Sequence, residues 1–216
     1  LIRHRKAGVQ DEGSQLVAYI FSLFAAEAKS ILDICAGPGG KAALLAHIAR
    51  RDGQVFVANE ISQARAKLVK NAVGSFEVLA GDAREIAQTG RTFDAILADV
   101  PCTGLGALRR RPEVRWRRSL QDLRELTLLQ NQISDAVISV LNPGGIYGYA
   151  TCSPHFAETS SETLMILKNH SELEQLDVAL HFPSNLHGAS RGKSMSLWTG
   201  IHGTDSMFLS IFRKKG

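Results

Sequence analysis

The chain has 216 residues, of which 44% are hydrophobic and 21% charged, and its formal net charge is +4. No apolar run approaches the ~20 residues that a membrane-spanning helix needs, and no signal peptide is visible. The three cysteines, Cys35, Cys102 and Cys152, are odd in number and widely spaced. This spacing argues against a disulfide framework and against a metal site, and it favours a reducing, cytoplasmic location.

Strand and helix patterns alternate along the chain. Residues 1–13 are polar and basic and are expected to form a lead-in, after which Ser14 is expected to cap a helix over 15–28. Apolar runs predict strands over 30–34, 54–59, 76–80, 93–98, 145–149, 173–176 and 207–213. Helices are expected over 40–50, 62–71, 119–141 and 158–170, and a loop over 183–205. The alternation predicts one α/β domain, residues 1–216, with a doubly wound, mostly parallel sheet.

Two cysteines follow the ends of predicted strands. Cys102 belongs to the segment DVPCTGLG, residues 99–106, and Cys152 belongs to YATCSP, residues 149–154. Ligands of open α/β sheets bind beyond the carboxyl ends of parallel strands. Burial explains most isolated cysteines. Two thiols delivered to one crevice instead favour covalent chemistry.

A glycine-rich turn, CAGPGGK at residues 35–41, joins the first strand to its helix. Gly37, Gly39 and Ala43 loosely match the dinucleotide fingerprint G-x-G-x-x-[GA]. Glu60 follows the second strand, where an acidic residue can hold ribose hydroxyls. A nicotinamide dinucleotide is therefore one candidate cofactor.

Two further acids favour a different cofactor. Asp33 lies inside the first strand, near the turn, where a carboxylate would suit a cationic cofactor. Asp82 follows the third strand, where it is expected to accept a hydrogen bond from an adenine amino group. Acids at the ends of consecutive strands suit S-adenosylmethionine, which has a ribose, an adenine and a cationic sulfonium but no phosphate. The set favours this cofactor, although each acid alone is more readily explained as a turn or cap residue.

An arginine-rich segment follows the first cysteine. Residues 109–118 contain six arginines together with Trp116, and Glu113 is their only acid. Guanidinium groups bind phosphates, and an exposed indole can stack on a base. The segment therefore predicts an RNA contact.

These stretches together resemble the RsmB/Sun family of RNA cytosine 5-methyltransferases, over essentially the whole chain. The matching stretches are residues 9–16 (VQDEGSQL), 32–41 (LDICAGPGGK), 81–83 (GDA), 99–106 (DVPCTGLG), 110–116 (RRPEVRW), 151–154 (TCSP) and 202–205 (HGTD). The arginine-rich stretch and HGTD are similar to the bacterial 16S ribosomal RNA enzymes in particular.

The resemblance implies a Rossmann-like class I fold and methyl transfer from S-adenosylmethionine to the 5-position of a cytosine in RNA, with 16S ribosomal RNA as the expected substrate. It implies Cys152 as the nucleophile and Cys102 as the thiol that helps to release the product. It implies a cofactor shell of Cys35, Ala36, Gly37, Pro38, Gly39, Gly40, Lys41, Glu60, Arg65, Asp82 and Asp99. The chain begins with leucine, so we expect a fragment that lacks the amino-terminal RNA-binding domain of larger members.

The residues alone leave several points open. From spacing, the two thiols are interchangeable. Asp99 is placed to hydrogen-bond the cytosine edge, and Lys41 to orient Asp99 or to favour the thiolate of Cys152. We expect a monomer with an RNA partner, no metal and no membrane. Two alternative functions are an NAD-dependent oxidoreductase and a non-catalytic RNA-binding module on a methyltransferase fold.

Overall fold

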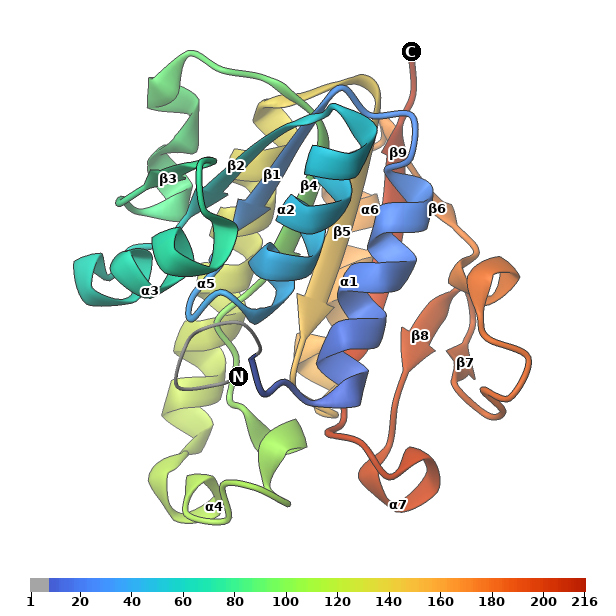
Figure 1. Cartoon of the computed structure of the whole chain (residues 1–216). Coiled ribbons are helices and arrows are strands. Elements are labelled where there is room, and N and C mark those ends of the chain that lie inside the picture. Colours follow the sequence, from blue (N-terminus) through green and yellow to red (C-terminus); the bar gives the residue numbers. More distant parts are fainter. Residues whose placement is uncertain (1–7) are drawn as a thin grey trace.

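The computed structural model describes residues 8–216, which form one mixed sheet with helices on both faces (Figure 1). The strands are β1 (Ser30–Ile34), β2 (Val55–Asn59), β3 (Glu77–Leu79), β4 (Phe93–Asp99), β5 (Leu141–Thr151), β6 (Leu173–Leu176), β7 (Ser190–Arg191), β8 (Ser194–Ser196) and β9 (Phe208–Lys214). The helices are α1 (Glu12–Phe24), α2 (Gly40–Asp52), α3 (Gln63–Val73), α4 (Val114–Arg117), α5 (Leu120–Ser139), α6 (Ser160–Asn169) and α7 (Thr199–His202). Short 3-10 helices are η2 (Ala83–Thr89), η3 (Leu105–Ala107), η4 (Phe156–Glu158) and η5 (Val178–His181).

The strand order is β3-β2-β1-β4-β5-β9-β8-β7, and β6 also pairs with β9. The strands from β3 to β5 in this order are parallel, whereas β9 runs antiparallel to β5. The order reverses between β1 and β4, so their carboxyl ends open the crevice at which such sheets bind ligands. The expected doubly wound, mostly parallel sheet is confirmed.

The sheet is buried on both faces because its central strands alternate between two hydrophobic clusters. In β4, Ala95 and Leu97 pack with α1 and α2, whereas Ile96 and Ala98 pack with α5 on the other side. Figure 1 shows α1 and α2 in front of the sheet and α5 and α6 behind it. A near-continuous apolar run is typical of a parallel strand covered on both faces.

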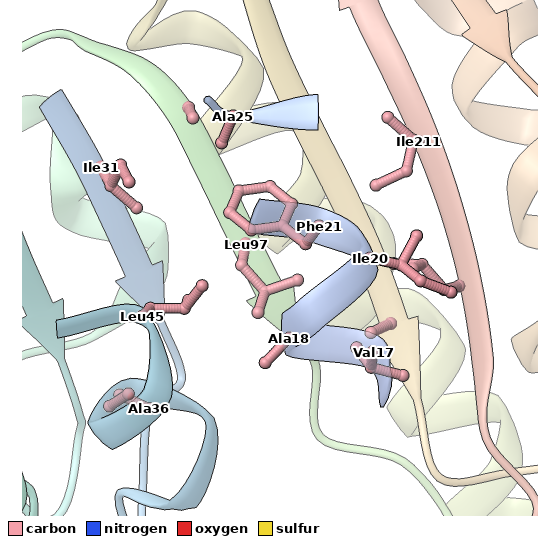
Figure 2. Close-up of a cluster of buried hydrophobic side chains, with 14 of the residues drawn as sticks. Val17, Ala18, Ile20, Phe21, Ala25, Ile31, Ala36, Leu45, Leu97 and Ile211 are labelled. Atoms are coloured by element: carbon pink, nitrogen blue, oxygen red, sulfur yellow. The ribbon is translucent and has the colours of Figure 1, made fainter. Parts of the chain in front are cut away.

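Helix α1 is fitted closely to the sheet. Figure 2 shows Phe21 and Ile20 of α1 facing Leu97 of β4 and Ile211 of β9, respectively. A Cβ atom on Gly148 of β5 would lie 2.6 Å from the ring of Phe21. Glycine at this position therefore makes room for the phenyl ring.

The structure corrects the first expected helix. Helix α1 begins at Glu12 instead of Gln15, and Asp11 is its cap, because the Asp11 carboxylate accepts a hydrogen bond from Gly13 N–H. Ser14 lies inside the helix, where Lys41 uses its hydroxyl as an acceptor. The expected lead-in thus ends before Glu12, and residues 1–7 lie outside the described range.

Two further differences concern β5 and the expected loop over 183–205. Helix α5 ends at Ser139, and β5 begins at Leu141 with an irregularity in its pairing to β4 before Ile146. The loop region contains β7, β8 and α7. Strands of two and three residues carry almost no local signal, and they form here because β8 pairs with β9.

No helix among residues 8–216 is long and apolar enough to cross a membrane.

Candidate active site

The glycine-rich turn between β1 and α2 lines a pocket of about 900 Å³ at the carboxyl edge of the sheet. Its lining includes all seven residues from Cys35 to Lys41, together with Asp33 and Asp99. Cys35 has φ of 66° and Gly39 has φ of 113°, so the chain bends sharply before α2 begins. A non-glycine residue in the left-handed region is uncommon and is found most often at functional turns.

Asp33 is the unusual group of this pocket. It is fully buried, and neither of its carboxyl oxygens has a hydrogen-bond partner among the described residues. Burial, followed by the negative charge of Asp99, raises the pKa of Asp33 to about 8. A buried carboxyl group without a partner is costly. A cationic ligand in the pocket would supply the missing partner.

Glu60 acts at the back of the glycine-rich turn. Its buried carboxylate accepts hydrogen bonds from Gly37 N–H at 3.0 Å and Ser62 N–H at 2.8 Å, and it forms an ion pair with Arg65 at 2.6 Å. A Cβ on Gly37 would lie 2.3 Å from this carboxylate. Glu60 and Arg65 are not among the residues that line the pocket. Glu60 holds the turn through its bond to Gly37 N–H, and ribose binding by Glu60 stays a prediction.

Asp82 lies apart from the main pocket. Its carboxylate accepts hydrogen bonds from the Arg84 side chain and backbone, which lower the pKa of Asp82. It lines a second hollow of about 590 Å³, together with Gln132 and Asp135. The adenine contact expected of Asp82 is thus a prediction that the pocket geometry does not support directly.

Lys41 and Asp99 form an ion pair between the glycine-rich turn and β4. Lys41 Nζ lies 2.7 Å from Asp99 Oδ2, and it also donates to the Ser14 hydroxyl at 2.7 Å. Burial would lower the pKa of Lys41, but the attraction of Asp99 outweighs it and raises the pKa. The lysine is therefore a fixed cation on the pocket wall, oriented by α1 and β4.

Cys102 and Cys152 face each other, with 3.3 Å between their sulfur atoms. The hydrogen bond with Cys102 is the largest cause that lowers the pKa of Cys152, and Lys41 lowers it further against burial and Asp99. The same hydrogen bond, burial and the charges of Cys152, Glu158 and Asp99 raise the pKa of Cys102 well above its ordinary value. Cys152 is thus the better-placed thiolate of the pair.

The turns that carry the two thiols are joined by their backbones. Gly106 N–H donates to the carbonyl of Cys152 at 2.9 Å, and Ser206 N–H donates to the carbonyl of Gly106 at 2.9 Å. A Cβ on Gly106 would lie 2.1 Å from Ser206 O and 2.6 Å from Cys152 O. Glycine is required here because two backbone segments approach it closely.

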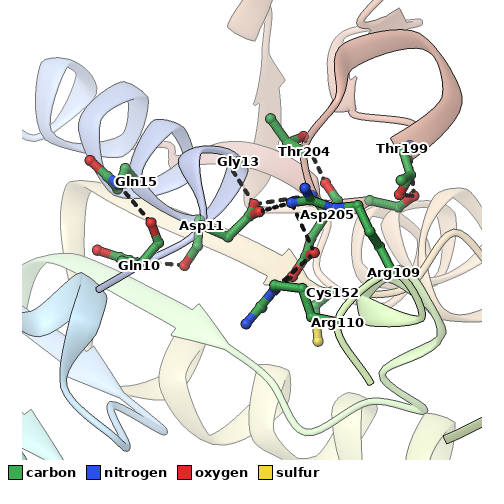
Figure 3. A network of polar contacts seen from close by, with 12 residues as sticks. Gln10, Asp11, Gly13, Gln15, Arg109, Arg110, Cys152, Thr199, Thr204 and Asp205 are labelled. Atoms are coloured by element: carbon green, nitrogen blue, oxygen red, sulfur yellow. Dashed lines mark hydrogen bonds and ion pairs between the residues drawn. The ribbon is translucent and has the colours of Figure 1, made fainter. Parts of the chain in front are cut away.

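Part of the arginine-rich segment is structural. Figure 3 shows Arg109 and Arg110 joined to Asp11 and Asp205, which links the start of α1 to the segment before β9. These two arginines were expected to bind RNA phosphates, yet both have buried acids as partners. Arg110 also lies near Cys152 (Figure 3).

The rest of the segment is open. Arg111, Arg115 and Arg117 form no ion pair and no side-chain hydrogen bond with another described residue, and Trp116 is 82% exposed. Arg118 Nε donates to the carbonyl of Thr103 at 3.1 Å, so the segment contacts the Cys102 turn directly.

The structure brings the four predicted catalytic residues together at one edge of the sheet. Sequence reasoning missed the buried groups around them, namely Thr103, Gln130 and Glu158. Glu158 stands six residues after Cys152, which is a local signal, but Gln130 lies on α5 and nothing in the sequence connects it to Cys102.

A doubly wound sheet of this kind is shared by several classes of nucleotide-binding enzyme, and the family match assigns this chain to the S-adenosylmethionine-dependent methyltransferases. The family model for 16S rRNA methyltransferase RsmB/F matches residues 20–213. The chain belongs to this family.

Individual relatives agree with that assignment. The chain is 44% identical to a putative methyltransferase of Mycobacterium tuberculosis (strain ATCC 25618 / H37Rv), over 99% of this chain and 47% of that protein. It is 32% identical to the ribosomal RNA small subunit methyltransferase B of Xylella fastidiosa (strain 9a5c), over 97% of this chain and 49% of that protein. The crystal structure of PH0851 superposes with a TM-score of 0.85 at 25% identity, over 96% of this chain and 47% of that one. The chain thus spans about half the length of the relatives it matches.

Proposed function

We propose that this chain catalyses the methylation of a cytosine in RNA at its 5-position and that the reaction proceeds through a covalent bond to Cys152. The observation that carries the proposal is the pair of sulfur atoms 3.3 Å apart, beside the Lys41–Asp99 ion pair at the edge of the pocket. Family membership supports RNA as the substrate and 16S ribosomal RNA as the expected target. Such a substrate fits the cytoplasmic location expected from the sequence.

The pocket fits S-adenosylmethionine as the cofactor. When bound, it supplies an electrophilic methyl group. Asp33 would face its positive charge, and residues 35–41 would line its amino-acid and ribose parts. The main support is Asp33, because its buried carboxyl group has no hydrogen-bond partner among the described residues and a cation in the pocket would favour its ionised form.

Cys152 makes the cytosine ring reactive. Its sulfur forms a bond to ring carbon 6, and the displaced π electrons make carbon 5 a nucleophile. The hydrogen bond from Cys102 and the charge of Lys41 lower the pKa of Cys152 and so favour the thiolate that this addition needs. Asp99 lies at the pocket wall, where it would hydrogen-bond the cytosine edge while Lys41 fixes its orientation.

Release of the product reverses the first step. The proton on carbon 5 goes to a base, its electron pair restores the ring double bond, and the bond between carbon 6 and sulfur breaks. The Cys152 sulfur leaves as a thiolate. Cys102 is within hydrogen-bond distance of that sulfur and stabilises it as it departs.

The RNA strand is expected to run along the open part of the arginine-rich segment. Arg111, Arg115 and Arg117 offer cations, and Trp116 offers an exposed ring for a base. The target cytosine must be single-stranded or extruded, because both ring faces are covered in a duplex.

The direct test is incubation of the chain with S-adenosylmethionine carrying a labelled methyl group and small-subunit ribosomal RNA, followed by nucleoside analysis. We expect the label in 5-methylcytosine, and none with Cys152→Ala. Label in another nucleoside, or equal labelling by both proteins, would contradict the proposal. Binding assays with NAD serve as the control for the oxidoreductase alternative.

A further inference from the structure

Glu158 is a buried carboxylate that the proposed chemistry does not use. It is fully buried in η4, and it has no ion-pair partner among the described residues. Its oxygens accept hydrogen bonds from Thr103 N–H at 2.8 Å, from the Thr103 hydroxyl at 2.5 Å and from Gln130 Nε2 at 3.1 Å. A buried charge satisfied only by neutral donors is rare in protein interiors. It therefore needs an explanation.

The donors around Glu158 fix the turn that carries Cys102. Thr103 directly follows Cys102, and its hydroxyl also lies 3.3 Å from the hydroxyl of Ser153, which follows Cys152. Gln130 Nε2 donates in addition to the carbonyl of Pro101, which directly precedes Cys102. Glu158 thus stands at the centre of a network that holds the residues flanking both sulfur atoms.

The charges around the two thiols are arranged asymmetrically. Lys41 acts on Cys152 and favours its thiolate, whereas Glu158 acts on Cys102 and opposes ionisation there. Asp99 opposes ionisation of both thiols.

Other charged or titratable groups near the turns do not reverse this pattern. Arg110 lies on the Cys152 side, so it adds to the effect of Lys41. Arg118 contacts the carbonyl of Thr103 from a half-exposed position, where solvent screens its charge. His155 uses Nδ1 to accept a hydrogen bond from Ala157 N–H.

We propose that Glu158 is a positioning residue that holds the Cys102 turn and, through its buried charge, keeps the proton of the thiol pair on Cys102, so that Cys152 is the sulfur that reacts. When Cys152 ionises, its proton leaves to solvent and the remaining S–H of Cys102 donates to the thiolate. The purpose of this arrangement rests on the proposed methyl transfer, but the location of the proton can be measured without RNA or cofactor.

The test is the competition of the two thiols for limiting iodoacetamide, with the labelled peptides quantified by mass spectrometry between pH 6 and 9. In the unaltered chain, Cys152 is expected to react before Cys102 over this range. Glu158→Gln keeps the shape of the side chain and removes its charge. Its remaining oxygen can accept from Thr103 N–H and Gln130 Nε2, and its NH2 group can donate to the Thr103 hydroxyl, which then acts as the acceptor. The Cys152 to Cys102 labelling ratio should then fall about tenfold, the equivalent of one pKa unit.

Glu162→Gln is the matched control. Glu162 is also a buried acid, on the adjoining helix α6, but its carboxylate accepts a hydrogen bond from Asn131 at 2.8 Å and contacts neither thiol turn. Burial raises the pKa of Glu162 to about 7, so the two variants are compared at pH 8 to 9, where Glu162 is ionised. There the Glu162 variant should leave the labelling ratio within twofold of that of the unaltered chain. An equal fall in both variants would overturn the proposal.

The remaining outcomes separate the two proposals. An unchanged ratio in a folded Glu158→Gln variant overturns the role of Glu158, whatever the activity of the chain. Absence of methyl transfer by the unaltered chain, together with the tenfold change, contradicts the proposed function and leaves the role of Glu158 intact. If the Glu158→Gln variant does not fold, the order of labelling in the unaltered chain still tests the proposal. Labelling of Cys102 before Cys152 would overturn the proposed charge asymmetry.

Discussion

The glycine-rich turn (residues 35–41) and the two thiol turns (residues 99–106 and 149–154) lie at the same edge of the sheet, but they differ in how completely the polar groups in and beside them are paired. Next to the glycine-rich turn, Asp33 has two unpaired buried oxygens facing a pocket of about 900 Å³. At the thiol turns, Thr103 is held through its N–H, its hydroxyl and its carbonyl, and Gly106 joins two backbone segments. Among the described side chains of these turns, the Thr151 hydroxyl is the one buried oxygen without a partner.

This difference fits the roles proposed for the two regions. A site for a ligand can leave a buried carboxyl group unpaired, because the ligand supplies the partner on binding. Two side chains that act together in one reaction must be held within a fraction of an ångström of the reactive geometry before the substrate binds. A bound ligand would add stability to the first region, whereas the second is held by contacts within the chain.

The largest effect is expected from a change that breaks the thiol turns. Gly106→Ala places a Cβ 2.1 Å from Ser206 O, so the backbone must move and the variant should lose about 3 kcal/mol of unfolding free energy. Chemical denaturation measures this loss. Gly200→Ala is the control, since no atom of residues 8–216 lies within 4 Å of its Cβ position and the change should be close to neutral. Equal stability of the two variants would show that the junction at Gly106 is not tightly packed.

A change at Asp33 tests the other region, the pocket beside the glycine-rich turn. The pKa of Asp33 is about 8 in the folded chain and near 3.8 when unfolded, so the folded chain binds an extra proton between these values. The free energy of unfolding should therefore fall as pH rises from 5 to 8, by about 3 kcal/mol from this group. Asp33→Asn should remove that fall and be the more stable protein at pH 8.

Urea denaturation at pH 5 and pH 8 measures the effect of Asp33. Asp82→Asn is the control. Arg84 lowers the pKa of Asp82 below its ordinary value, so this group stays ionised in both states and adds no slope between pH 5 and 8. Parallel pH profiles for Asp33→Asn and the unaltered chain would contradict an unpaired carboxyl in the pocket.

The arginine-rich segment also has a paired part, Arg109 and Arg110, and a part, including Arg115 and Arg117, that is unpaired among the described residues. Substitutions in this segment should have the smallest effects. Replacing Arg115 and Arg117 by alanine should lower the log–log salt slope of RNA binding by about 1.4 and leave stability unchanged. Replacing Arg109 and Arg110 should instead lower stability by about 1 kcal/mol after solvent screening, since both pair with buried acids. Fluorescence anisotropy with a single-stranded RNA and thermal unfolding measure the two quantities. An exchange of the two results would show that the paired arginines are the phosphate contacts.

The central strands could be predicted because their signal is local. The apolar runs over 30–34 and 93–98 correspond to Ser30–Ile34 and Phe93–Asp99 in the structure. Two faces of burial produce such runs regardless of what lies elsewhere in the chain. The glycine-rich turn and both thiol turns were found for the same reason, because each directly follows a strand end.

The features that were missed depend on partners far along the chain. Asp11 caps α1 in preference to Ser14, and its carboxylate also pairs with Arg109, 98 residues away. Gln130 contacts the carbonyl of Pro101 and the carboxylate of Glu158, 29 and 28 residues away. Local sequence patterns carry no information about such pairs. The buried groups around the predicted catalytic residues could therefore be identified only in the structure.

The most direct measurement uses denaturing gel electrophoresis of Cys102→Ala and Cys152→Ala after incubation with substrate RNA and S-adenosylmethionine. Cys152→Ala should form no covalent complex and should lose turnover by about a thousand-fold or more. Cys102→Ala should accumulate a complex that survives denaturation, because the departing thiolate has lost its hydrogen-bond donor. A complex that forms only with Cys152→Ala would exchange the two roles, and no complex with either variant would contradict the covalent mechanism.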